Sequence, residues 1–328
     1  MEVTLPEGLD GFLADAGWPN AVIEPLPGDA SFRRYFRLRM GEKTAMLMDA
    51  PPPNEDPGPF LRAARWLDEN GMRAPRILHA EPERGLVLLE DFGETRMRDY
   101  LDDWPADEEE IYAGAIDALT ALHRLPPGPF LDYSLTEYQR EAQLFVDWYV
   151  PARNLYVDGR GWAAAWQEAF AALLPNQRPG VTVLRDYHAE NIMLLSSLDK
   201  QGLLDFQDAL IGHAAYDLVS LLQDARRDVS PDLEAKMLDR YLEGYAGDRA
   251  AFLADYALLG AQRNAKIVGI FVRLWKRDGK PRYLAMIPRV WAAMERDLAH
   301  PALAPVARWF DANIPADLRE ALGGDWHA

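Results

Sequence analysis

The sequence contains no cysteine in 328 residues, and it contains no run of 18 apolar residues. The first absence excludes disulfide bonds and thiolate metal sites, and it fits a reducing compartment. The second excludes a membrane-spanning helix of the usual kind. The N-terminal stretch "MEVTLPEGLDGFLADAG" has neither a basic region nor an apolar core, so we expect no signal peptide and a cytoplasmic protein.

Positive charge is scarce. Lysine and arginine number 35 against 52 acidic residues, which gives a formal net charge of −17. Such a chain repels nucleic acid and anionic lipid, so we expect neither as a partner. The basic residues gather in three places, namely "SFRRYFRLR" (31–39), "ARRD" (225–228) and "QRNAKIVGIFVRLWKR" (262–277). This arrangement is typical of a protein that handles a small anion.

The first ninety residues read as a small lobe rich in strands. Three stretches, "AVIEPL", "FRRYFRL" and "TAMLMDA", predict strands, and turn-forming residues separate them. The stretch 58–71 has apolar residues at helical spacing and ends at Gly71, so it predicts a helix. "GLVLLEDFGE" predicts a further strand with a polar exit.

Helices dominate the rest of the chain. Residues 107–125, 134–150 and 161–174 predict helices, and more helical segments follow toward the C-terminus. The short apolar runs "VTVL", "NIMLL" and "GLLDF" predict strands among them. We therefore predict an α+β chain of two lobes, which its length and 49% hydrophobic content can support.

Polar residues crowd into "LRDYHAEN" (184–191), and another acid follows in "LLDFQDA". A hairpin of "IMLL" and "GLL" would bring Asn191 and Asp205 together at its open end. An amide oxygen and a carboxylate suit Mg²⁺, which takes few protein ligands and adds substrate phosphates. Asp186 would then be available to accept a proton, which is the division of labour that phosphoryl transfer needs.

The same spacing fits other uses. Five polar groups could form a two-metal hydrolase site, although only one histidine lies nearby and the chain has no other His-x-Asp pair. The aspartates could also be turn or cap residues without chemistry. From spacing alone, all three interpretations stay open.

The motifs together resemble those of the aminoglycoside phosphotransferase-like kinases, which share the bilobal fold of protein kinases. "RDYHAEN" and "LLDFQDA" resemble their catalytic loop and metal-binding motif, and the resemblance covers about residues 20 to 310. It implies an antiparallel-sheet lobe with one helix at 1–90, a hinge at 91–94 and a mainly helical lobe at 95–328. It also implies ATP and Mg²⁺ as cofactors.

Within that superfamily, "GDASFRRYF", "DFQDALIGHAAYDLVSLLQDARR" and "QRNAKIVGIF" resemble the anomeric kinases that phosphorylate the C1 hydroxyl of N-acetylmuramate and N-acetylglucosamine in cell-wall recycling. The resemblance implies Asp186 as the base, Asn191 and Asp205 as metal ligands, and Asp217 as the support of the catalytic loop. It implies nucleotide contacts from the phosphate-covering loop and the hinge, at Asp29, Ala30, Ser31, Phe32, Arg33, Arg34, Glu90, Asp91 and Phe92.

One departure from the family pattern is plain. Kinases of this fold usually place a lysine or arginine on the third strand and pair it with a helix glutamate. Here Met48 stands near that place, and the following helix has no glutamate before Glu69. We hypothesise that Arg33 or Arg34 supplies the phosphate contact, because guanidinium pairs well with phosphate oxygens.

For the acceptor, we expect a small amino sugar beside Asp186 in a protein that is a monomer or weak dimer. A basic residue would suit the lactyl carboxylate of N-acetylmuramate. The candidate substrate-binding residues are His188, Gln207, Asp224, Arg226, Arg263 and Lys266. Two alternatives remain, a kinase of the same fold for an aminoglycoside or amino alcohol and a nucleotide-binding module without turnover.

Overall fold

The computed structural model describes residues 5–27, 32–196 and 200–326. The chain forms two compact units. Unit 1 comprises Met1–Asp103 with Asn191–Ala209, and unit 2 comprises Trp104–Glu190 with Leu210–Ala328. The lobe boundaries expected from the sequence stay a prediction.

Unit 1 is built on an antiparallel sheet with the strand order β1–β2–β3–β5–β4. In the central pair, Arg34 lies opposite Asp49 and Tyr35 lies opposite Met48. A two-residue turn, Gly41 and Glu42, connects this pair of strands, β2 and β3, as the sequence predicted. The strands are β1 (Val22–Pro25), β2 (Arg34–Met40), β3 (Lys43–Asp49), β4 (Ile77–Glu81) and β5 (Leu86–Glu90).

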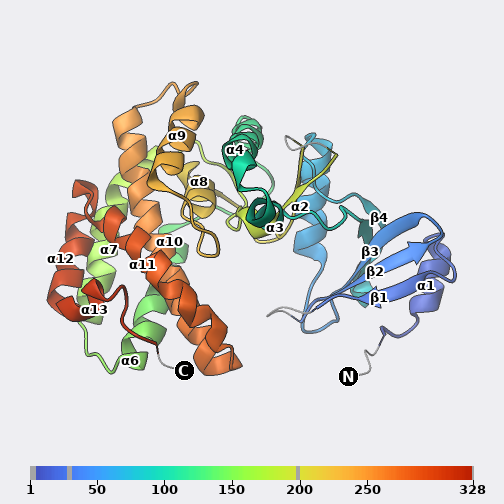
Figure 1. Cartoon of the computed structure of the whole chain (residues 1–328), viewed down its shortest axis with the longest axis horizontal. Coiled ribbons are helices and arrows are strands. Elements are labelled where there is room, and N and C mark those ends of the chain that lie inside the picture. Colours follow the sequence, from blue (N-terminus) through green and yellow to red (C-terminus); the bar gives the residue numbers. More distant parts are fainter. Residues whose placement is uncertain (1–4, 28–31, 197–199, 327–328) are drawn as a thin grey trace. The chain divides into compact units, whose positions relative to one another are not determined.

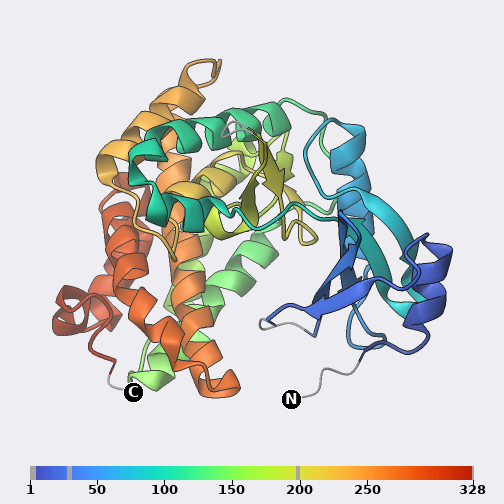
Figure 2. The same cartoon turned by 45° about the vertical axis from the view of Figure 1, so that its right-hand side comes forward.

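The two faces of this sheet meet different helices. Helix α1 (Leu9–Asp15) buries Phe12 and Leu13 against alternate strand residues such as Phe36 and Leu47. Helix α2 (Gly58–Glu69) lies on the other side of the sheet, as the two views in Figures 1 and 2 agree. Strand alternation therefore directs Phe36 and its neighbours toward α1 and leaves Tyr35 and Met48 on the opposite face.

A two-stranded hairpin from later in the chain belongs to the same unit. Strand β7 (Ile192–Leu194) pairs with β8 (Gln201–Leu203), and Ile192 lies opposite Leu203. Helix α3 (Met97–Asp103) contacts β7, and Phe206 stacks on Phe60 of α2 with ring centroids 5.2 Å apart. These contacts fix the hairpin within unit 1.

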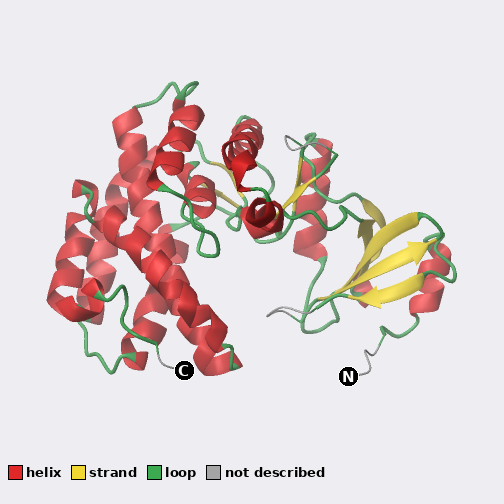
Figure 3. Ribbon diagram, viewed as in Figure 1, coloured by secondary structure: helices red, strands yellow, loops and turns green. Residues whose placement is uncertain are grey.

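Unit 2 is mainly helical between residues 104 and 190 and between 210 and 326, and Figure 3 draws its helices as red ribbons in the same view as Figure 1. Two short strands, β6 (Val181–Val183) and β9 (Leu210–Gly212), pair antiparallel. Its helices are α4 (Glu108–His123), α5 (Leu135–Leu144), α6 (Val150–Ala152), α7 (Gly159–Asn176), α8 (Ala215–Leu222), α9 (Pro231–Leu242), α10 (Arg249–Asp278), α11 (Ile287–Leu298), α12 (Ala304–Asn313) and α13 (Ala316–Glu320).

Helix α10 is the centre of this unit and packs against α5, α8 and α11. Its Gly269 lies so close to α5 that an added Cβ would come within 2.3 Å of the Leu144 backbone. The predicted helix 134–150 is not uniform there, because residues Phe145–Tyr149 form a π-helical turn directly after α5. The glycine permits this close approach of two backbones.

The predicted α+β class, the small antiparallel sheet and the mainly helical remainder are confirmed. The described part of residues 1–90 contains one α-helix more than predicted, since α1 accompanies α2 there. Within the described ranges, every helix is too short or too polar to cross a membrane.

Candidate active site

The loop after β6 carries Asp186 and is held by a buried carboxylate of unit 2. Asp217 on α8 is 0% exposed, and its two oxygens accept hydrogen bonds from the backbone N–H groups of Leu184 (2.7 Å) and Arg185 (2.8 Å). Arg185 has the left-handed φ of 72°. Burial raises the pKa of Asp217 to about 7, although the two N–H donors oppose that rise. The backbone that presents Asp186 is thus fixed by two charge-assisted bonds.

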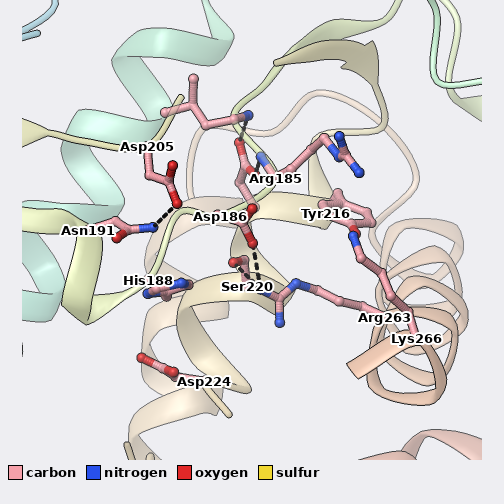
Figure 4. Close-up of polar contacts among 12 residues, drawn as sticks. Arg185, Asp186, His188, Asn191, Asp205, Tyr216, Ser220, Asp224, Arg263 and Lys266 are labelled. Atoms are coloured by element: carbon pink, nitrogen blue, oxygen red, sulfur yellow. Dashed lines mark hydrogen bonds and ion pairs between the residues drawn. The ribbon is translucent and has the colours of Figure 1, made fainter. Parts of the chain in front are cut away.

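Asp186 lies among cations. Arg263 and Lys266 extend from α10 toward this loop (Figure 4), and Arg263 Nη2 lies 3.7 Å from Asp186 Oδ1. Arg263 is 3% exposed and also donates to Ser220 Oγ at 2.8 Å. Burial raises the pKa of Asp186, but attraction to Lys266 and Arg263 outweighs it and leaves the pKa below its ordinary value. Asp186 is therefore ionised at neutral pH and is a weak base.

In unit 1, the hairpin brings Asn191 and Asp205 together, as its strand pairing predicted. Leu204 N donates to Asn191 O at 2.9 Å, and Asn191 Nδ2 lies 3.4 Å from Asp205 Oδ2 (Figure 4). Asp205 adopts a left-handed φ of 57°, which aspartate tolerates better than most residues. Gln207 Nε2 donates to Asp205 Oδ1 at 2.6 Å, so this predicted substrate residue contacts the candidate metal ligand.

The donor set at this hairpin fits Mg²⁺. One carboxylate and one amide oxygen are the hard ligands that Mg²⁺ accepts together with water and phosphate oxygens. Across the described part of the chain, no three His, Cys, Asp or Glu side chains gather to hold a metal. A Mg²⁺ ion held by two protein ligands would take its remaining ligands from substrate phosphates and solvent.

A second polar cluster in unit 2 joins His188, Asp224 and Arg226. The Asp224 carboxylate accepts the backbone N–H groups of Ala189 (3.2 Å) and Arg226 (2.8 Å), and Arg226 Nη1 lies 3.3 Å from His188 Nε2. Burial lowers the pKa of His188, so its imidazole is neutral at pH 7. The Arg226 side chain is 27% exposed and also contacts Glu190 at 3.0 Å. Of the predicted substrate-binding cations, Arg226 is thus more accessible than Arg263 and Lys266.

The phosphate-covering loop is described in part. Asp29, Ala30 and Ser31 lie outside the described residues, and Phe32 is 67% exposed. Arg34 Nε donates to Asp49 Oδ2 at 2.8 Å, opposite it on β3. Asp49 is only 2% exposed, so this ion pair compensates a buried carboxylate.

Arg33 lies on the side of the sheet that carries Met48. It donates to Glu55 at 3.1 Å, and it hydrogen-bonds to the hydroxyl of Tyr35, which in turn contacts Met48 Sδ at 3.5 Å. Burial raises the pKa of Tyr35, and the nearby Asp205 carboxylate adds to that rise while Arg33 opposes it. Arg33 therefore brings a cation to the face of the sheet that carries Met48.

The side chains of the predicted hinge are engaged in contacts within unit 1. Glu90 accepts from Arg73 Nη2 at 2.7 Å, and this hydrogen bond lowers its pKa to about 2. Asp91 pairs with Arg37 at 2.9 Å. The ring of Phe92 lies so close to Gly202 that a Cβ there would come within 2.5 Å of it. A nucleotide at this segment would therefore meet mainly its backbone.

Two residues of these clusters were missed from the sequence. Glu55 pairs with Arg33 across 22 residues of chain, and Glu141 on α5 contacts Arg185 and Lys266. Both look like surface acids in the sequence, and helical spacing gives no signal for either. Their partners come from distant segments, so only the folded chain identifies them.

Residues 22–253 match the model of the phosphotransferase enzyme family. The chain is 38% identical to the N-acetylmuramate/N-acetylglucosamine kinase of Caulobacter vibrioides, over 94% of this chain and 96% of that protein. It is 40% identical to the protein of the same name from Pseudomonas aeruginosa, over 89% of each.

Solved structures of similar fold include a choline/ethanolamine kinase family protein from Mesorhizobium loti. That structure has a TM-score of 0.60 at 17% identity and covers 88% of this chain and 93% of its own. An aminoglycoside-3′-phosphotransferase of type VIII has a TM-score of 0.53 at 20% identity, over 77% of this chain and 98% of its own. At these identities the likeness establishes the fold alone.

Proposed function

The chain belongs to the phosphotransferase enzyme family and is a kinase for a sugar hydroxyl, and from this premise we propose that it phosphorylates the C1 hydroxyl of N-acetylmuramate and N-acetylglucosamine. One observation carries the proposal. The similarity to two kinases named for these sugars extends over at least 89% of each chain. The product would be the sugar 1-phosphate in peptidoglycan sugar recycling, made with ATP.

Asp186 is the proposed general base. As the C1 oxygen bonds to the γ-phosphorus of ATP, the C1 O–H bond breaks and its proton passes to the Asp186 carboxylate. The bond from the γ-phosphorus to the bridging oxygen breaks at the same time, and ADP leaves with that electron pair. Catalysis then depends on position and charge rather than on a covalent intermediate.

The weak basicity of Asp186 fits this acceptor. The ring oxygen draws electrons from C1, so the anomeric hydroxyl is more acidic than other sugar hydroxyls. A base whose pKa lies below its ordinary value can accept that proton in a transition state where the hydroxyl is already losing it. Cations next to the base also disfavour a cationic acceptor such as choline or an aminoglycoside.

Asn191 and Asp205 are the proposed Mg²⁺ ligands. When bound, the ion would neutralise charge that develops on the β- and γ-phosphate oxygens. Asp217 holds the catalytic loop, and Gln207 orients Asp205 through its hydrogen bond. The backbone of Glu90, Asp91 and Phe92 remains our proposed contact for adenine.

For the substrate, we assign the lactyl carboxylate to Arg226. Its guanidinium is partly accessible and lies beside His188, which could bind a sugar hydroxyl. Arg263 and Lys266 are more deeply buried and are engaged with Ser220 and Glu141. Asp224 contributes by fixing the backbone at Arg226 rather than by contacting the sugar.

For the phosphate contact that Met48 cannot make, we propose Arg33, held by Glu55. The pair places a guanidinium on the Tyr35 face, and both side chains are largely buried, with 14% and 16% exposed. The Arg33–Glu55 pair would have the role that a cation on the third strand and a helix glutamate have in related kinases. Arg34 is instead committed to Asp49.

Separate alanine substitutions distinguish the two arginines. We expect Arg33→Ala to lower kcat/KM for ATP about 10–100-fold, because one charge-assisted contact to phosphate is lost. We expect Arg34→Ala to leave the KM for ATP unchanged but to destabilise the fold by about 1–2 kcal/mol, because the buried Asp49 carboxylate loses a partner that is itself partly exposed. Steady-state kinetics and urea unfolding measure both effects. If neither variant changes KM or kcat, the hypothesis that one of these arginines binds phosphate in place of a strand lysine is wrong.

The acceptor is tested by an ATP-consumption screen. The panel contains N-acetylmuramate, N-acetylglucosamine, glucosamine, choline and kanamycin. We expect turnover with the two N-acetyl sugars, and a ¹³C–³¹P coupling at C1 of the product identifies the phosphorylated hydroxyl. A separate Arg226→Gln variant should raise the KM for N-acetylmuramate about tenfold with little change for N-acetylglucosamine, because only the former carries a carboxylate.

Other outcomes of the screen decide against the proposal. Turnover with choline or kanamycin alone would assign the chain to another acceptor. Phosphate at a carbon other than C1 would reject the anomeric site while leaving the sugar kinase intact. ATP binding without turnover of any compound in the panel would contradict the proposal that these N-acetyl sugars are the acceptors.

A further inference from the structure

Glu141 is a buried carboxylate at the junction of α5, α10 and the catalytic loop. Only 1% of it is exposed. Its Oε1 accepts from Lys266 Nζ at 2.9 Å and from Arg185 Nη2, and its Oε2 accepts from the Tyr133 hydroxyl and from Gln262 Nε2 at 3.3 Å. Four donors on one carboxylate exceed what simple packing of a helix requires.

The surroundings of this carboxylate are aromatic and buried. Tyr133 stacks on Tyr138 with centroids 3.9 Å apart, and Tyr216 lies against both rings. Tyr216 also receives a hydrogen bond from Lys266 at 3.2 Å. Charges interact more strongly in such a poorly solvated place than they do at a surface.

Both cations that contact Glu141 also belong to the surroundings of Asp186. Arg185 directly precedes Asp186 in the chain. Lys266 lies on the same helix as Arg263, which pairs with Asp186. Lys266 and Arg263 are the first two cations that lower the pKa of Asp186. Figure 4 shows both side chains reaching from α10 toward the loop.

Without the negative charge of Glu141, positive charge would be in excess around the loop that carries Asp186. Burial raises the pKa of Glu141, but Lys266 and Arg185 outweigh it and lower the pKa to about 2. Burial instead raises the pKa of Asp217 to about 7, so Asp217 holds its negative charge less firmly than Glu141 does. The titratable and charged groups that face Asp186 are Lys266 and Arg263 from α10, Arg185 and His188 from its own loop, and Asp217 from α8.

We propose that Glu141 is a positioning residue, which holds Lys266 and Arg185 away from direct pairing with Asp186 and so sets the strength of that base. This inference rests on the proposed role of Asp186. Without the Glu141 charge, Lys266 is free to bind the Asp186 carboxylate itself. That contact would weaken the base and occupy the oxygen that must take the proton.

The first test is Glu141→Gln, which keeps the shape and removes the charge. We expect kcat to fall about 10–100-fold while the KM for ATP stays within about twofold. The acid limb of the kcat/KM–pH profile should move to lower pH by at least about half a unit, because Lys266, released from Glu141, would stabilise the ionised form of Asp186 more strongly. Glu137→Gln is the matched control, since Glu137 is on the same helix and its strongest partner is Arg140 at the surface, at 2.9 Å.

The second test removes the cation instead. Lys266→Met should move the acid limb to higher pH, because Asp186 loses its leading positive neighbour. The double variant Glu141→Gln with Lys266→Met should have a kcat at least about threefold higher than that of Glu141→Gln alone, since neither of the two charges is left without its partner. A merely structural role for Glu141 predicts losses that add, with no opposite shifts of the pH profile.

The outcomes separate this inference from the proposed function. If Asp186→Asn retains turnover, the base assignment fails and with it the premise. If Asp186→Asn is inactive but Glu141→Gln matches Glu137→Gln in kcat and pH profile, the positioning role is wrong and the base assignment stands. If Glu141→Gln does not fold, Lys266→Met decides, and an unmoved acid limb overturns the proposal.

Discussion

Replacing Asp186 by asparagine should lower kcat about 10²–10⁴-fold, the usual contribution of a positioned general base. The side chains have nearly the same size, so the loop held by Asp217 should keep its conformation. Arg263 would lose one ion-pair partner but keep Ser220. The KM for both substrates should therefore change far less than kcat. Stopped assays of ADP release measure the loss.

The control for this variant is Asp239→Asn, an exposed aspartate of unit 2 that pairs with Arg249 at the surface. It should have the kcat of the unchanged protein. Equilibrium binding of a fluorescent ATP analogue shows whether Asp186→Asn still holds nucleotide. Loss of that binding, or a kcat reduced less than about threefold, would mean that Asp186 is not the base.

The hairpin of β7 and β8 could be predicted because its signals are local. Short apolar runs flank "DYHAEN" and "DFQDA", so the pairing of Ile192 with Leu203 follows from the pattern. Once the two strands pair, Asn191 and Asp205 must meet at their ends. A few residues of sequence contain all of this information.

The cation sites could not be predicted to the same depth. The sequence indicated that Arg33 or Arg34 replaces a strand lysine, but it could not choose between them. That choice depends on Asp49, opposite Arg34, and on Glu55, which reaches Arg33 from beyond β3. Contacts of this kind arise from the register and the loop path together, which no single window of sequence specifies.

Helix α10 shows the same limit of sequence-based prediction for the surroundings of Asp186, our proposed base. Its spacing places Gln262 and Lys266 on one face, and the sequence suggested that this face binds substrate. In the fold that face meets Glu141, more than 120 residues earlier, and its Lys266 is 11% exposed. A charge pattern on a helix can thus indicate a functional surface, but the partner that fixes its role comes from tertiary packing.

Replacing Asp205 by asparagine should produce the second large loss. A ligand carboxylate becomes a neutral amide, so the affinity for Mg²⁺ with nucleotide should fall at least about tenfold and kcat about 10²–10³-fold. Asparagine is chosen because the φ of 57° at this position suits it almost as well as aspartate, whereas alanine would add backbone strain. Raising Mg²⁺ should restore part of the rate.

Electron paramagnetic resonance of Mn²⁺ with ADP measures the metal affinity without turnover, so loss of the ligand can be told from loss of chemistry. Asp68→Asn, an exposed aspartate on α2 of the same unit, is the matched control and should bind Mn²⁺ normally. Gln207→Ala should weaken Mn²⁺ binding less than Asp205→Asn, because it removes a hydrogen bond to the carboxylate and not the ligand. Unchanged Mn²⁺ affinity in Asp205→Asn would move the metal site away from the hairpin, and Asp205 would then serve to shape the turn.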